Sequence, residues 1–181
     1  LAPGKARKRG REGNQIAQSF SIDPENDFPT YVVAGRYQEK VIRTRQGDIQ
    51  FWTFHSVDGP PAQVAAERLS SSMKTLTEFY GSASKRKSAV RIAESPAELP
   101  SEFGAPGGPG GASFPEGALL DPRAFTQGIA SEEVLRLAEY ELARTWFGWR
   151  VRPRPEARIL MGRGMGLFGL VIAAEGRGQG E

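Results

Sequence analysis

The chain has 181 residues, about the length of one domain, and 39% of them are hydrophobic, which is enough to bury a core. Its formal net charge of +3 is too small to indicate a nucleic-acid partner. The absence of cysteine excludes disulfides and thiolate metal sites, and the single histidine, His55, is too few for a conventional zinc enzyme.

The two ends of the chain are polar. Residues 1–19 are rich in Lys, Arg and Gly, which is typical of a solvated, poorly ordered arm or linker, and they lack the aromatic residues that single-stranded nucleic acids stack on. We expect one domain over residues 20–176 and a polar tail over 177–181. No apolar run reaches the length of a transmembrane segment, and the sequence begins at Leu1 without a signal-peptide pattern. We therefore expect a fragment of a larger multidomain chain, whose compartment the sequence does not indicate.

The first half of the domain predicts strands followed by a long helix. Residues 30–34, 37–43 and 48–55 are rich in β-branched and aromatic residues and predict three strands. His55 ends the third run. Because the sequence offers it no second ligand, we expect a surface or packed histidine and not a catalytic one. Residues 60–80 begin with two prolines and carry apolar side chains at helical spacing, which predicts a helix.

The second half of the domain predicts shorter elements that a long loop separates. Residues 88–93 predict a fourth strand, the Pro/Gly-rich stretch at 95–111 a flexible loop, and residues 118–120 a short edge strand. Ser131 is a suitable N-cap for an amphipathic helix that continues to about residue 148.

Four separated segments resemble one family. They are residues 29–35 (P-T-Y-V-V-A-G), 76–81 (L-T-E-F-Y-G), 111–117 (G-A-S-F-P-E-G) and 140–148 (Y-E-L-A-R-T-W-F-G). The last two lie where zinc aminopeptidases of the membrane-alanyl-aminopeptidase (gluzincin) family have G-A-M-E-N-x-G and H-E-L-A-H-Q-W-F-G. The resemblance runs from about residue 20 to residue 175. It implies an α+β fold, the thermolysin-like (zincin) N-terminal catalytic subdomain, with a mixed β-sheet packed on long helices.

The resemblance also implies a zinc site, but the residues at its positions are of the wrong type. The zinc-ligand positions hold Tyr140, Arg144 and Arg163, the position that binds the substrate's amino terminus holds Phe114, and only the general-base position is retained, as Glu141. Zinc catalysis depends on a metal ion that lowers the pKa of a bound water molecule, and arginine is always protonated and cannot ligate a cation. We therefore expect no metal and an idle Glu141.

Arg144 and Arg163 should enter the space beside Glu141. One interpretation is a salt-bridged plug that holds two helices together. The other is a binding site for an anion or a peptide carboxylate, because a guanidinium group can bind a carboxylate with two parallel hydrogen bonds.

A competing motif lies near the end of the chain. Residues 164–169 match G-x-G-x-x-G, and they follow residues 158–161, which fit a short strand or a helix start, and precede an apolar run that is helical in the second half of 162–174. This is the context of a dinucleotide fingerprint, but the twelve residues after Gly169 leave no room for the second strand.

We favour a non-catalytic, peptidase-like scaffold or binding domain of a larger protein. One alternative is an active metallopeptidase or aminopeptidase that other parts of the full-length protein complete. A second alternative is a nucleotide-binding module that uses the glycines from Gly164 to Gly169.

Overall fold

The computed structural model forms two compact units, Leu1–Ala34 and Gly35–Glu181. The residues that the structure describes are 5–12, 15–21, 33–82, 89–101, 108–114, 117–151, 153–157 and 159–178.

The first unit contains two antiparallel strands, β1 (Lys5–Glu12) and β2 (Gln15–Ser21), whose register shifts between Ala6 and Lys8. The sequence predicted a poorly ordered arm over residues 1–19, and the structure instead pairs most of this segment. A search for apolar periodicity does not find this pair, because β1 is mostly charged and lacks the alternation of apolar and polar side chains that indicates a strand. Of the strand predicted over 30–34, residues 30–32 lie outside the described part, and Val33 and Ala34 are not in a strand.

The second unit is built on a five-stranded mixed sheet with the strand order β3-β4-β5-β7-β6. The β3/β4 and β6/β7 pairs are antiparallel, whereas β4/β5 and β5/β7 are parallel. The strands are β3 (Gln38–Arg43), β4 (Asp48–Thr53), β5 (Val90–Glu94), β6 (Gly111–Phe114) and β7 (Gly117–Leu120). The α+β class, with a mixed sheet packed on long helices, is confirmed.

The sheet differs from the prediction at one edge. The strand expected at 118–120 is internal, because β6 pairs with its outer side. β6 begins at Gly111, where the predicted Pro/Gly-rich loop was expected to end. A Cβ built on Gly117 would lie only 2.3 Å from the carbonyl oxygen of Arg91, so glycine here serves close strand pairing and does not mark a loop.

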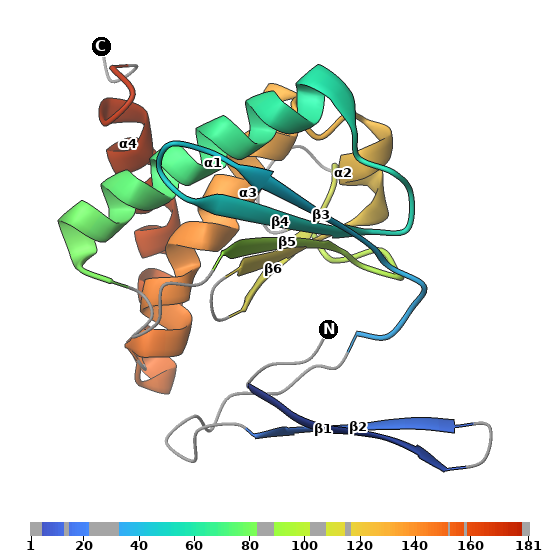
Figure 1. The fold of residues 1–181 in the computed structure, drawn as a ribbon. Helices are drawn as coiled ribbons and strands as arrows, with labels where there is room; N and C mark the ends of the chain where they lie inside the picture. The colour runs from blue at the N-terminus through green and yellow to red at the C-terminus, as the bar shows by residue number, and fades with distance from the viewer. Residues whose placement is uncertain are drawn as a thin grey trace. The chain divides into compact units, whose positions relative to one another are not determined.

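Helices cover one face of the sheet (Figure 1). The α-helices are α1 (Gly59–Tyr80), α2 (Pro122–Thr126), α3 (Glu132–Arg144) and α4 (Met165–Glu175). Two π-helical segments, η1 (Thr145–Arg150) and η3 (Leu160–Gly164), and a 3₁₀ turn, η2 (Pro155–Ala157), connect α3 to α4. As predicted, the Ser131 hydroxyl caps α3 by accepting a hydrogen bond from the N–H of Val134 at 3.4 Å.

Two apolar clusters join these layers. The larger lies between the sheet and α1 and α3, where Phe51, Leu69, Ile92 and Leu142 are fully buried. The smaller joins the ends of three helices and consists of Leu76, Ala143, Trp146 and Ile172. The indole N–H of Trp146 also donates to the carbonyl oxygen of Gly81 at 2.8 Å, which ties the end of α1 to η1.

Helix α4 approaches α3 closely because it presents glycine there. A Cβ built on Gly169 would lie 2.4 Å from the Cβ of Ala143, and one built on Gly166 would lie 2.6 Å from the Tyr140 ring. Real Cβ atoms do not approach other atoms this closely, so neither position accepts even alanine without movement of the helices.

Replacing Gly169 with alanine is expected to lower the free energy of unfolding by about 1–3 kcal/mol, because the methyl group overlaps a packed interface. Gly162 is the matched control. A Cβ built there meets no atom within 4 Å, so Gly162→Ala should be neutral or stabilising by up to about 1 kcal/mol. Urea unfolding measures both variants, and equal stabilities would contradict the close approach of α3 and α4.

Candidate functional site

Helix α3 buries three consecutive polar side chains, those of Glu139, Tyr140 and Glu141, each with an exposed fraction of only 1%. Consecutive residues of an α-helix point about 100° apart, so the three side chains meet different neighbours. Glu139 faces α1 and the end of α4, whereas Glu141 lies against the start of β6, where a Cβ on Gly111 would be 2.9 Å from its Cγ.

Three of the predicted site residues lie together. Nη1 of Arg144 donates to both carboxylate oxygens of Glu141 at 3.2 Å, and its guanidinium carbon lies 5.4 Å from the centroid of the Tyr140 ring. The cation therefore lies between a carboxylate and the face of a phenol, and both contacts favour its charge. Because Arg144 follows Glu141 by three residues on one helix, the pair forms from local geometry alone.

The other two predicted site residues belong to other elements of the fold. Arg163 belongs to η3 and its side chain is exposed. Phe114 is the last residue of β6 and is buried against Gly117. The position of Arg163 beside Glu141 stays a prediction.

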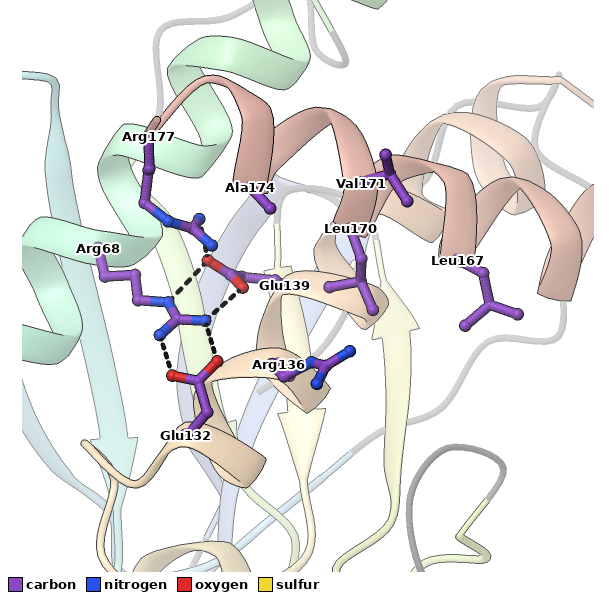
Figure 2. Close-up of a pocket in the computed structure, with 9 residues that line it drawn as sticks. All are labelled: Arg68, Glu132, Arg136, Glu139, Leu167, Leu170, Val171, Ala174 and Arg177. Atoms are coloured by element: carbon purple, nitrogen blue, oxygen red, sulfur yellow. Dashed lines mark hydrogen bonds and ion pairs between the residues drawn. The ribbon is translucent and has the colours of Figure 1, made fainter. Parts of the chain in front are cut away.

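The sequence reasoning missed a second cluster, which is centred on Glu139 (Figure 2). Nε and Nη2 of Arg68, on α1, donate to its two carboxylate oxygens at 3.0 Å each. The hydroxyl of Ser72 and Nη1 of Arg177 donate to Oε1 at 2.6 and 2.5 Å. Arg68 also bridges to both oxygens of Glu132. The carboxylate of Glu139 thus has partners from α1 and from the turn after α4.

The charges of this cluster stabilise one another. The hydrogen bond from Arg68 is the main cause of a lowered pKa at Glu132, where it outweighs the opposing effect of burial, and the charges of Arg68, Arg136 and Arg177 lower the pKa further. The same bond is the first cause of a raised pKa at Arg68. The sequence contained one indication of the Glu139 cluster. Arg68 and Ser72 are four residues apart, so their polar side chains lie on the same side of α1 as its apolar residues.

A hollow of about 440 Å³ adjoins the cluster. Charged side chains of α1, α3 and the turn after α4 form one side, and apolar side chains of α4 form the other (Figure 2). Its lining residues are Arg68, Glu132, Arg136, Glu139, Leu167, Leu170, Val171, Ala174 and Arg177.

The dinucleotide interpretation of residues 164–169 is wrong. Gly164 belongs to η3, and Gly166 and Gly169 lie inside α4, so the glycines form no loop between a strand and a helix. The strand considered over 158–161 is absent as well, because Leu160 and Met161 are helical and residue 158 lies outside the described part. The glycines instead let α4 pack on α3.

Comparison with solved structures identifies the architecture. The M1 zinc metallopeptidase from Deinococcus radiodurans matches 99% of this chain with a TM-score of 0.61 and 14% sequence identity. Its E323A mutant bound to a Tyr-Ser-Ala substrate matches 98% of the chain with a TM-score of 0.56, also at 14% identity. The chain has the M1 metallopeptidase fold. Comparisons with protein-family models and with curated protein sequences found no match.

Three further findings concern the extent of this M1-fold chain and the groups that its described part contains. It spans 38% of the length of the Deinococcus enzyme. Among the residues placed by the structure, no three or more His, Cys, Asp or Glu side chains gather in a group that could hold a metal ion. No helix in the same part of the chain is long and apolar enough to cross a membrane.

We expect two Glu→Gln substitutions in the Glu139 cluster to differ greatly in their effect on the free energy of unfolding. Glu139→Gln removes a fully buried carboxylate charge that pairs with Arg68 and Arg177, whose side chains are only 14% and 13% exposed, and should cost about 3–5 kcal/mol of unfolding free energy. Glu132 is the control, because its side chain is 66% exposed and Glu132→Gln should cost no more than about 1 kcal/mol. Chemical denaturation compares the variants, and similar losses would contradict a central role for Glu139.

Proposed function

We propose that this chain is a non-catalytic, metallopeptidase-like domain that acts as a scaffold or binding part of a larger protein. The observation that carries the proposal is the contact of Arg144 with both oxygens of Glu141 and with the Tyr140 ring. By the sequence resemblance, these residues stand at two zinc-ligand positions and at the general-base position. The guanidinium group of Arg144, which stays protonated, then supplies beside Glu141 the positive charge that zinc supplies in an M1 enzyme.

The side chains at these positions do not fit zinc. Structural and catalytic zinc sites use neutral imidazoles, thiolates and carboxylates, and this donor set offers a guanidinium, a phenol and one carboxylate that is already paired. A zinc ion beside Glu141 would be repelled by Arg144, which stays protonated. Without a metal-bound water molecule, Glu141 has no evident proton to remove, and we assign it no catalytic role.

The larger protein enters the proposal through the comparison with M1 enzymes, in which the matched part is 38% of the Deinococcus chain. The alternative of an active peptidase requires zinc ligands from other parts of the full-length protein. Such ligands would also have to displace Arg144 from Glu141. This second requirement makes the alternative less favourable than a domain that binds or supports without catalysis.

Zinc content and peptidase activity test the proposal together. After dialysis against zinc, the unmodified chain should retain no stoichiometric metal by plasma mass spectrometry and should not hydrolyse amino-acid p-nitroanilides. The variant Tyr140→His/Arg144→His/Arg163→Glu should gain zinc, because it restores a donor set that zinc prefers. Circular dichroism establishes that both proteins are folded. Stoichiometric zinc in the unmodified chain, with hydrolysis that Glu141→Gln abolishes, would refute the proposal.

A more specific version of the proposed binding role is that Arg144 and Arg163 bind an anion or a peptide carboxylate. Titration with acetate, followed by the NMR signal of the Trp146 indole, should then give a saturable shift that Arg144→Gln weakens. Trp146 is a suitable reporter because it follows Arg144 by two residues and its indole is buried. An unchanged Trp146 signal would leave the scaffold role and exclude this ligand class.

A further inference from the structure

Helix α4 and the π-helical turn η3 that precedes it present apolar side chains to solvent. Among the eleven residues of α4, Glu175 at the end is the single charged one. One side of α4 is buried, but Leu160, Leu167 and Val171 are exposed by 70%, 48% and 52%. Steps of seven and four residues place these three side chains on about the same side of a continuous helix, where a helix in water normally carries polar residues.

The apolar surface continues beyond this stripe. Ile159 is 74% exposed, and together with Leu160 it is the most exposed large apolar side chain in the part of the chain that the structure describes. The exposed ring of Phe168 meets the exposed ring of Phe79, on α1, edge-on with 6.1 Å between the ring centroids. Single exposed apolar residues are ordinary, whereas a connected group of them marks an interaction surface. The η3–α4 surface consists of Ile159, Leu160, Leu167, Phe168 and Val171.

The segment that leads into the η3–α4 surface is strongly basic. Residues 150–163 contain five arginines and one glutamate, a formal charge of +4 (5 − 1), and residues 164–174 contain no charged side chain. The whole chain carries +3, so the remainder of the chain is slightly acidic overall. Of these arginines, Arg154 and Arg163 have side chains that the structure describes, and both are exposed. A partner of this region should therefore be apolar and anionic at once.

An anionic lipid bilayer offers both features in one surface. Its headgroups attract arginine side chains, and its acyl chains take up exposed apolar side chains. A nucleic acid would use the arginines but has no partner for Ile159 and Leu160, because its outer surface is phosphate and sugar. A second copy of this chain would bring two basic segments of like charge together.

The length of the helix indicates that it would lie on a bilayer and not cross it. η3 and α4 together cover residues 160–175, which is about 24 Å at 1.5 Å per residue. The hydrocarbon core of a bilayer is about 30 Å thick.

We propose that the η3–α4 surface binds this chain to an anionic phospholipid membrane. Ile159, Leu160 and Phe168 enter the boundary between headgroups and acyl chains, and the arginines of residues 150–163 contact the headgroups. The inference goes beyond the proposed function, because it does not depend on zinc or on the pairing of Arg144 with Glu141. Its failure would leave the non-catalytic assignment unchanged.

Co-sedimentation of the 181-residue chain with lipid vesicles tests the proposal. The chain should bind vesicles of mixed phosphatidylserine and phosphatidylcholine, and it should bind pure phosphatidylcholine at least about tenfold more weakly. The affinity should fall as salt is added, because salt screens the attraction between the arginines and the headgroups.

Two double variants separate the apolar from the electrostatic contribution. Ile159→Ser/Leu160→Ser should weaken binding at least about tenfold, because two apolar side chains no longer leave water. Arg152→Gln/Arg154→Gln should weaken binding about 25-fold at low salt, at about fivefold for each charge. Circular dichroism establishes that each variant is folded.

Strand β3 supplies the matched controls. Val41→Ser replaces an apolar side chain that is 45% exposed, and Arg43→Gln/Arg45→Gln removes two exposed charges at the same spacing as the arginine variant. Both controls should bind vesicles nearly as well as the unmodified chain.

Insertion into the bilayer has its own readout. The chain has no native cysteine, so a nitrobenzoxadiazole dye attached to Leu160→Cys reports on that position alone. Its emission should shift to the blue when phosphatidylserine vesicles are added, whereas the emission of the same dye at Val41→Cys should not change.

Each other outcome overturns the proposal. The chain could fail to bind phosphatidylserine vesicles, or it could bind them equally well with Ile159→Ser/Leu160→Ser, in which case charge alone would carry the binding. Binding of a DNA duplex in place of vesicles would assign the arginines to a nucleic acid. A dimer in sedimentation equilibrium without lipid, which Leu160→Ser abolishes, would assign the surface to a second copy.

Discussion

The buried carboxylate of Glu139 is the interaction on which the helical layer depends. It accepts hydrogen bonds from Arg68 and Ser72 on α1 and from Arg177 after α4, so one side chain joins three helices that are far apart in sequence. A charge withdrawn from water is tolerated only when it is fully paired. The helices are therefore held in the one arrangement in which all these partners reach Glu139, and this arrangement also places α3 against the sheet.

The same helix carries a second acidic residue with a guanidinium partner, but the two pairs differ in kind. Glu139 is paired with arginines from other elements, whereas Glu141 is paired with Arg144 one turn away on α3 itself. The first pair specifies tertiary structure. The second adds little to the fold's topology, and the proposed function rests on it because the sequence resemblance places Arg144 and Glu141 at a zinc-ligand and at the general-base position.

The helices α1 and α3 could be predicted because the sequence features that determine them lie within the helices themselves or next to them. The prolines and the apolar stripe of α1 and the Ser131 cap of α3 lie within a few residues of what they determine, and the structure has both helices close to the expected bounds. β6 was missed because its partner strand and close packing, not its own glycine-rich sequence, make it a strand. The Glu139 cluster was missed because Ser72 and Arg68 lie 67 and 71 residues before Glu139 in the sequence, and only the folded chain brings them together.

The Arg144–Glu141 pair has a consequence for which substitutions this sequence can accept. Glu141 is buried, and any single exchange that removed Arg144 would take away the counter-charge beside it and destabilise the domain. A new metal ligand would compensate only once the remaining ligands were also in place. Sequences that had lost Arg144 but did not yet bind a metal would therefore be less stable than the present one, so under the proposed function the guanidinium group disfavours stepwise acquisition of a zinc site.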